Sequence, residues 1–232
     1  MGTYKTNDHG AERVGVEHQA NAIDPYDDLY DTRKAAAELR AYRTKGLMPW
    51  ATVLTDRLKT DGVAGASVLD IGGGIGSIHH ELLEAGAASA VGIDASTAYV
   101  AAAREESDRR GHSDRVSYRH GDFIQLAPSV APAEIVILER VLNVSGEWEQ
   151  LASLAAERTR RQLGVVIPRD TPFVRAVIGV INLSLRRRGN QVRAAVVPLD
   201  ALDRIAATHG LRRRSADKAG PAWQAVVYVR DD

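Results

Sequence analysis

The most informative segment of the chain is Val68-Leu69-Asp70-Ile71-Gly72-Gly73-Gly74-Ile75-Gly76. The apolar run 67–71 predicts a short buried strand, the glycines predict a tight loop, and the pattern of 78–85 predicts a helix after it. In a parallel sheet such a loop lies at the carboxyl edge, where ligands bind. Glycines let a ligand approach the backbone, and the start of the helix offers free N–H groups. The motif therefore predicts a ligand-binding loop at 72–76.

Strand and helix patterns alternate on the C-terminal side of this loop. Further strands are predicted at 90–93, 115–119, 134–138, 164–167, 211–215 and 223–230, and helices at 96–110, 148–163 and 199–208. The turn around Gly220 and Pro221 allows a hairpin, which would make the last strand antiparallel. Two more helices, 31–44 and 49–58, precede the motif. The pattern predicts an α/β fold, a Rossmann-like, seven-stranded, mostly parallel sheet with helices on both faces.

The composition excludes several classes of protein. The chain has 232 residues, 30 Lys+Arg against 30 Asp+Glu, and no cysteine. Without cysteine there are no disulfides, thiolate zinc sites, iron–sulfur clusters or cysteine nucleophiles. The balanced charge gives no general attraction to nucleic acid. We therefore expect a small-molecule partner, no nucleic acid and no metal site.

The apolar stretches of the sequence bear on the cellular location of the protein and on membrane insertion. Residues 1–19 are polar and lack an apolar run of signal-peptide length. The longest apolar stretch, 173–185, is too short to span a bilayer and contains Arg175. We expect a cytoplasmic protein without stable membrane insertion, either a monomer or a homodimer.

The chain divides into two parts and one insert. Residues 1–60 are predicted to form an N-terminal arm and lid helices, and 61–232 a cofactor-binding core with an insert at about 169–198. One helical face of the insert is apolar: Phe173, Val177, Ile178, Ile181 and Leu185. Arg186–Arg188 follow directly. We favour a roof over the substrate pocket, while a dimer face and an interfacial membrane helix remain open.

The spacing of the glycines separates two classes of ligand. A dinucleotide fingerprint, G-x-G-x-x-G, requires glycine at position 77, where this chain has Ser77. Here the glycines fall at 72, 74 and 76. Asp94 ends the second strand, where a carboxylate can accept two hydrogen bonds from ribose hydroxyls in either class; capping of the next helix is the alternative.

With Asp70 before it, this G-x-G-x-G spacing resembles motif I of class I S-adenosylmethionine (SAM) methyltransferases. The resemblance covers about 67–230 and implies that fold, SAM as cofactor and S-adenosylhomocysteine (SAH) as product. It implies that the following residues bind the cofactor: Asp70, Gly72, Gly73, Gly74, Gly76, Asp94, Ala95, Asp122, Phe123, Glu139 and Arg140. By the same resemblance Asp122 binds the adenine amino group and Phe123 lies against the ring. The alternatives are a simple turn at Asp122 and a plain ion pair between Glu139 and Arg140.

The C-terminal half resembles magnesium-protoporphyrin O-methyltransferases and related small bacterial methyltransferases. The resemblance rests on the strand end 166–168, the insert after it, the helix 199–208 and the closing strand WQAVVYVR. Where those porphyrin enzymes have a candidate catalytic histidine, this chain has Asn143. Asparagine cannot act as a general base but can orient a substrate. A tetrapyrrole acceptor is therefore not expected.

Candidate catalytic residues follow from the chemistry of the cofactor. SAM carries an activated methyl group, so the protein must align the acceptor and needs a base only if the acceptor loses a proton. The candidates are Asn143 after the fourth strand, Tyr30 and Tyr26 in the lid segment, and His79 beside the glycine loop. Packing for the tyrosines, and a solvated or capping role for His79, are the alternatives.

These observations lead to one main function and one alternative. The main prediction is a SAM-dependent methyltransferase that moves a methyl group to an oxygen or nitrogen of a small molecule, a biosynthetic intermediate. The alternative is a SAM-fold enzyme that catalyses a cyclisation or decarboxylation of a natural-product intermediate. A nucleic-acid methyltransferase is disfavoured because the chain lacks a D/N-P-P-Y/F motif and cysteine.

Overall fold

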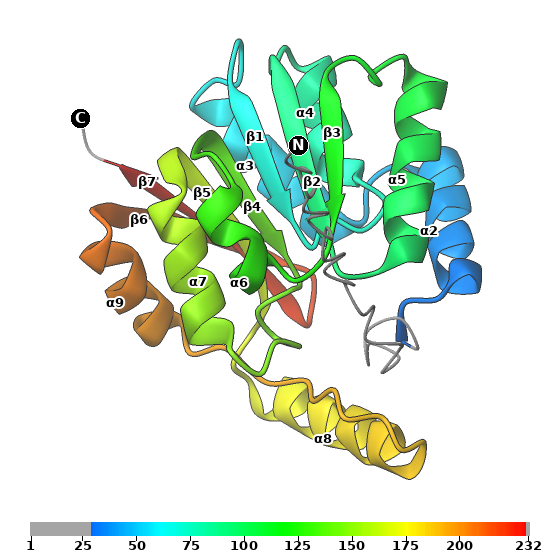
Figure 1. Cartoon of the computed structure of the whole chain (residues 1–232). Helices are drawn as coiled ribbons and strands as arrows, with labels where there is room; N and C mark the ends of the chain where they lie inside the picture. The colour runs from blue at the N-terminus through cyan, green and yellow to red at the C-terminus, as the bar shows by residue number, and fades with distance from the viewer. Residues whose placement is uncertain (1–28, 231–232) are drawn as a thin grey trace, which may run out of the picture.

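The computed structural model describes residues 29–230, which form one seven-stranded sheet with helices on both faces (Figure 1). The strand order is β3-β2-β1-β4-β5-β7-β6. The strands are β1 (Ser67–Ile71), β2 (Ser89–Asp94), β3 (Val116–His120), β4 (Ala133–Glu139), β5 (Thr159–Pro168), β6 (Leu211–Ala219) and β7 (Trp223–Arg230). Strands β1 to β5 are parallel, and β7 runs antiparallel to both β5 and β6. The predicted fold class and the C-terminal hairpin are confirmed.

The helices bury two separate cores against the two faces of the sheet. The longer helices are α2 (Thr32–Lys45), α3 (Pro49–Thr60), α4 (Ser77–Glu84), α5 (Thr97–Arg110), α7 (Trp148–Glu157), α8 (Pro172–Arg187) and α9 (Leu199–Thr208). Two short turns, α6 (Phe123–Leu126) and η1 (Ala127–Ser129), follow β3. Helices α3 and α4 pack on one face through residues such as Leu54, Leu58 and Leu82. Helices α7 and α9 pack on the other through Leu151 and Leu202. The helices on the two faces together fix the position of the carboxyl ends of β1, β2 and β4.

Strand β5 begins earlier than the sequence predicts. We expected a helix over 148–163 and a strand over 164–167, but α7 ends at Glu157 and β5 covers Thr159–Pro168. Residues in this segment find ladder partners on both sides, since Thr159 pairs with Ala133 and Gln162 with both Ile135 and Val229. No glycine or proline marks the end of the helix, so local signals did not reveal the boundary.

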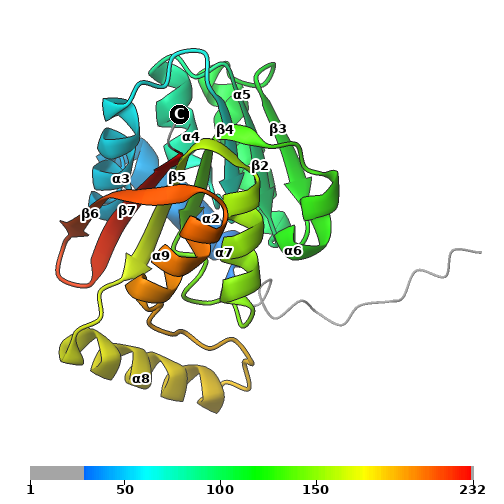
Figure 2. The same cartoon turned by 90° about the vertical axis from the view of Figure 1, so that its left-hand side faces the viewer.

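The insert stands apart from the sheet. Helix α8 follows the carboxyl end of β5 and lies at one end of the molecule in both views (Figures 1 and 2). The segment after it runs back along the helix. The Asn182 side chain holds it there, donating a hydrogen bond to the Ala194 carbonyl and accepting one from the Ala194 N–H, both of 2.8 Å. Within residues 29–230, no helix combines the length and apolar character required to cross a bilayer.

Candidate active site

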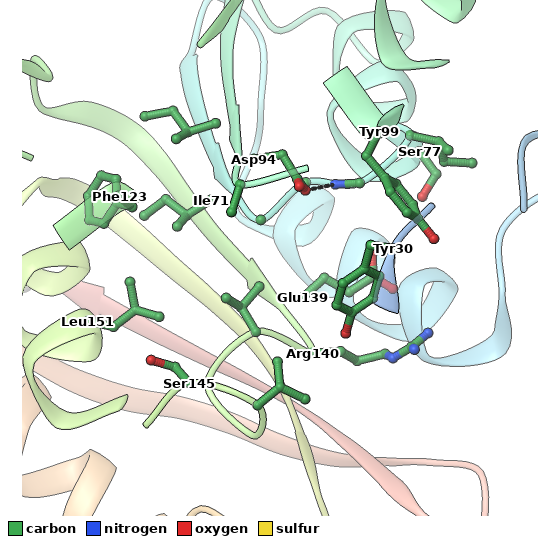
Figure 3. A pocket seen from close by; sticks show the side chains of 18 of the residues that line it. Tyr30, Ile71, Ser77, Asp94, Tyr99, Phe123, Glu139, Arg140, Ser145 and Leu151 are labelled. Atoms are coloured by element: carbon green, nitrogen blue, oxygen red, sulfur yellow. Dashed lines mark hydrogen bonds between the residues drawn. The ribbon is translucent and has the colours of Figure 1, made fainter. Parts of the chain in front are cut away.

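A cavity of about 620 Å³ lies at the carboxyl edge of β1, β2 and β4 (Figure 3). Loops after these strands and after β3 contribute lining residues, among them Gly72, Gly73, Gly74, Asp94, Ala95, Asp122, Phe123, Glu139, Arg140 and Ser145. The N-terminal helices contribute others, among them Glu38, Tyr42, Met48 and Trp50. Phe123 and Leu151 lie on one side, and Tyr30 and Tyr99 on the opposite side (Figure 3). Most of the predicted cofactor-binding residues therefore share one cavity.

The glycine loop needs glycine for two physical reasons. Gly72 and Gly74 have φ of 62° and 56°, in the left-handed region that side chains rarely adopt. A Cβ at Gly72 would overlap the Val141 side chain, and one at Gly73 would lie 2.6 Å from Asp70 Oδ2. The loop is thus packed on both sides, and its backbone faces the cavity.

Asp70 and His79 lie beneath the loop, not in the cavity. Both are 1% exposed, and Asp70 Oδ2 is 2.7 Å from His79 Nδ1. His79 Nε2 lies 3.0 Å from the hydroxyl of Tyr118. Gly76 is also outside the cavity lining, packed against the His79 ring. The prediction that His79 faces the pocket as a catalyst is wrong, and Asp70 and Gly76 support the loop without lining the cavity.

Asp94 ties the glycine loop to the end of β2. Its Oδ2 accepts a hydrogen bond from the Gly74 N–H (2.9 Å), and its Oδ1 accepts one from the Ser96 N–H (2.8 Å). Burial raises the pKa of Asp94 to about 6, against the lowering effect of these two bonds. The side chain of Ser96, not of Asp94, is the N-cap of α5. Asp94 is thus a partly buried carboxylate in the cavity wall, with one further lone pair on each oxygen.

Asp122 combines a structural role with a place in the cavity. Its side chain caps α6 by accepting a hydrogen bond of 2.9 Å from the Ile124 N–H. It lines the cavity together with the buried ring of Phe123. The turn at Asp122, which was the alternative to adenine binding, is therefore present, and it places Asp122 and Phe123 in the cavity wall.

Glu139 and Arg140 end β4 in an unusual arrangement. Arg140 has a φ of 59°, the only positive value of a non-glycine residue in 29–230. Its guanidinium lies 4.8 Å from the ring centre of Trp50 and 5.2 Å from that of Trp223. Glu139 Oε1 accepts a hydrogen bond of 2.7 Å from Trp50 Nε1. Burial raises the pKa of Glu139 to about 7, although Arg140 and the Trp50 bond lower it. A plain ion pair does not describe these contacts.

The N-terminal helices close the side of the cavity that faces α5. Ser96 Oγ donates a hydrogen bond of 2.7 Å to the Tyr30 carbonyl, and the ring of Tyr30 meets that of Tyr99 edge-on at 5.7 Å. The Tyr42 hydroxyl donates to Glu81 Oε1 at 2.8 Å, which fixes α2 to α4. Tyr30 therefore lies where the sequence places it, while Tyr26 lies outside the described residues.

Asn143 and the insert are not part of the cavity wall. Asn143 is 7% exposed, and its carbonyl accepts a hydrogen bond of 2.7 Å from the Ala195 N–H at the end of the insert. Its neighbours Val144 and Ser145 line the cavity instead. No residue of 169–198 does so, and the prediction that α8 roofs the pocket is wrong.

Residues 68–162 match the sequence profile of a methyltransferase domain. The matched segment contains the glycine loop and the segments after β2, β3 and β4, and the Rossmann-like sheet around it is the fold of class I methyltransferases. No curated protein sequence matches the chain at a significant level.

Solved structures show the same fold at low identity. The chain is similar to magnesium protoporphyrin IX methyltransferase from Synechocystis PCC 6803 with bound SAH, with 19% identity, 90% of this chain and 100% of that chain covered, and a TM-score of 0.67. An O-methyltransferase family protein from Burkholderia thailandensis has 20% identity, 88% and 61% coverage, and a TM-score of 0.68. An O-methyltransferase family 2 protein from Planctomyces limnophilus DSM 3776, in complex with apigenin, has 18% identity, 91% and 63% coverage, and a TM-score of 0.64.

Several residues that line the cavity were not predicted from the sequence. Trp50, Tyr42 and Tyr99 lie on helices whose sequences contain no motif that points to a ligand. Their place in the cavity depends on how α2 and α3 dock, which no local motif encodes. Ser145 follows β4 within a few residues of Glu139, and its position after a parallel strand was the one available signal.

Proposed function

We propose that this protein is a SAM-dependent methyltransferase that transfers a methyl group to an oxygen or nitrogen atom of a small molecule. One observation carries the proposal. A single cavity joins the glycine loop of a methyltransferase domain to Asp94, to Asp122 with Phe123, and to a second region around Glu139. The first three would hold the cofactor, and the last would receive the acceptor.

The residues of the first region suit the cofactor chemically. Gly72 to Gly74 expose backbone where a Cβ would collide with neighbouring side chains. Asp94 keeps a lone pair on each oxygen for ribose hydroxyls, while the Asp122 carboxylate and Phe123 ring suit an adenine. When bound, SAM supplies a methyl group on a sulfonium, and the protein then has to orient the acceptor and exclude water.

The second region suits an acceptor that must lose a proton. Glu139 lies in the cavity wall, held by Trp50, and its pKa of about 7 lets it accept a proton near neutral pH. Ser145 and Tyr30 add hydrogen-bonding groups to the wall of the same cavity (Figure 3). We assign Glu139 the role of proton acceptor, because His79 lies outside the cavity.

A small acceptor fits the size and charge of the protein. A cavity of about 620 Å³ must hold both ligands, and pockets of this size suit small molecules. The chain has no net positive charge to attract a nucleic acid. The similar structures include a protein bound to apigenin and one named for a porphyrin substrate, which supports a small organic acceptor.

Calorimetry with SAM and SAH tests the proposal directly. Both should bind the wild type, and Asp94→Asn should weaken binding about tenfold or more, because a hydrogen bond to a charged group contributes about 1.5–3 kcal/mol. Asp200→Asn, which removes an exposed carboxylate on α9, is the matched control and should bind normally. Absence of binding by the wild type at high ligand concentration would disprove the function.

Product analysis separates methyl transfer from the alternative reactions. A panel of phenols, carboxylic acids and amines, incubated with SAM, should yield SAH together with a methylated acceptor. Conversion of an acceptor without SAH release would favour cyclisation or decarboxylation instead.

A further inference from the structure

Helix α8 presents an apolar face that no described residue covers. Phe173 is 65% exposed and Val180 69%, and Val177 and Ile181 are also exposed. Residues 173, 177, 180 and 181 recur at helical spacing and share one side of the helix; we call them the apolar face of α8. The other side is occupied, since Val174 and Leu185 are buried and Asn182 bonds to Ala194. The exposed face is thus not required for packing within residues 29–230.

The insert that bears this face is strongly basic. Residues 169–198 contain six arginines and one acidic residue, Asp170, so the insert has a net charge of +5 in a chain of net charge zero. Asp170 is held by Arg175 at 2.6 Å. Arg186, Arg187 and Arg188 follow the apolar face at the C-terminal end of the helix and are exposed. The insert therefore combines a net positive charge with the exposed apolar face of α8.

An apolar helix face beside clustered arginines matches one type of partner. We propose that α8 docks on the surface of an anionic lipid bilayer, with its axis in the plane of the surface. Amphipathic helices bind there through buried apolar area and through attraction of basic residues to anionic headgroups. A second copy of this chain is a poorer partner, because it would place one +5 insert against another.

The position of α8 allows this orientation. The helix lies along one end of the molecule, beyond the edge where β5 ends (Figures 1 and 2). It can therefore contact a flat surface before the sheet and the other helices do. Since β1 to β5 are parallel, this is also the edge that carries the cavity.

Vesicle flotation with the full chain tests the proposal. The probes are vesicles of phosphatidylcholine alone and vesicles of equal parts phosphatidylcholine and phosphatidylglycerol. We expect the protein to float with the anionic vesicles, to bind the neutral ones weakly, and to be released by salt, because salt screens the attraction. Equal binding to both vesicles, or binding to neither, overturns the proposal.

Two variants separate the apolar and the basic contributions. Phe173→Ser with Val180→Ser keeps the charge and should abolish most binding. Replacement of Arg186, Arg187 and Arg188 by glutamine should weaken binding by on the order of a hundredfold, at about fivefold for each arginine near the surface. The matched control changes three exposed arginines outside the insert to glutamine: Arg204, Arg212 and Arg214.

The control should bind like the wild type, and all variants should keep the far-ultraviolet circular dichroism spectrum and unfolding midpoint of the wild type, since the residues are exposed. Equal losses in the insert and control variants would show a general charge effect and contradict docking through α8. A wild-type dimer that the serine variant dissociates, without lipid binding, would assign the face to a second copy and overturn the proposal.

Discussion

The charge state of Glu139 offers a sharp test of the site because its effect on stability has a definite sign. Burial raises the pKa of this carboxyl from 4.5 to about 7 in the folded protein. The folded state therefore holds the proton at pH values where the unfolded chain has released it. Stability is highest below the unfolded pKa and is lost as the pH rises through about 7.

The size of this loss follows from the pKa values. A rise from 4.5 to about 7 corresponds to about 3 kcal/mol, of which about 2.5 kcal/mol is lost between about pH 5 and about pH 8. Glu139→Gln is neutral at every pH and keeps an oxygen to accept the Trp50 N–H. We expect the variant to match the wild type at about pH 5 and to exceed its free energy of unfolding by up to about 2.5 kcal/mol at about pH 8.

Urea unfolding of both proteins at the two pH values measures this difference. The matched control is Glu149→Gln, the same change at an exposed position on α7, which should show no comparable gain at the higher pH. A Glu139→Gln effect that does not change with pH, or a wild type that is more stable than the variant at about pH 8, would refute the reasoning.

The same variant tests the catalytic assignment once an acceptor is found. With an acceptor that loses a proton, Glu139→Gln should lower kcat by about 10²–10⁴-fold and remove the decline of activity below about pH 7. SAH affinity should change little, which separates loss of the base from loss of the cofactor site. An unchanged pH profile of kcat would show that another group, or water, takes the proton.

Three further predictions concern the glycine loop and its support. Gly72→Ala should weaken SAH binding by at least tenfold in calorimetry, because its Cβ would overlap the Val141 side chain. The control is Gly111→Ala, which has a φ of 68° and nothing within 4 Å of the added Cβ. It imposes the backbone strain alone and should leave the affinity unchanged. His79→Ala should cost about 3 kcal/mol of unfolding free energy in urea, because it leaves the buried Asp70 without its partner; loss of kcat at full stability would restore a catalytic role. If ribose hydroxyls donate to the ionised form of Asp94, as proposed, SAH affinity should fall as the pH drops below about 6, and titrations of Asp94→Asn should lose this dependence.

The sequence predicted the carboxyl edge well because the signals there are local. Strands β1, β2 and β4 each contain a short apolar run, and acidic residues mark strand ends, as Asp94 does at the end of β2 and Asp122 does after β3. The topology then brings these ends together without further information. Asp94, Ala95, Asp122, Phe123, Glu139 and Arg140 consequently line the cavity.

The docking of the N-terminal helices and of the insert could not be predicted in this way. The place of Trp50 in the cavity depends on a hydrogen bond to Glu139, which is 89 residues away in the sequence. The apolar residues of α8 gave a correct helix but no indication of what it packs against. An amphipathic pattern states that a face is apolar, and only the tertiary structure shows whether anything covers it.

The error at Asp70 and His79 has a different cause, since the alternation of β1 already contains the answer. Successive side chains of a strand point to opposite faces of the sheet. Leu69 and Ile71 belong to the core under α7 and α9, whereas Val68 belongs to the core under α3 and α4. Asp70 must therefore point to the side of the sheet that α4 covers. His79 lies there in the first turn of α4, with its Nδ1 2.7 Å from Asp70 Oδ2. The motif predicts that the acidic residue before a glycine loop contacts the ligand, whereas the alternation of the strand predicts that it lies beneath the loop. In this structure Asp70 follows the alternation of the strand.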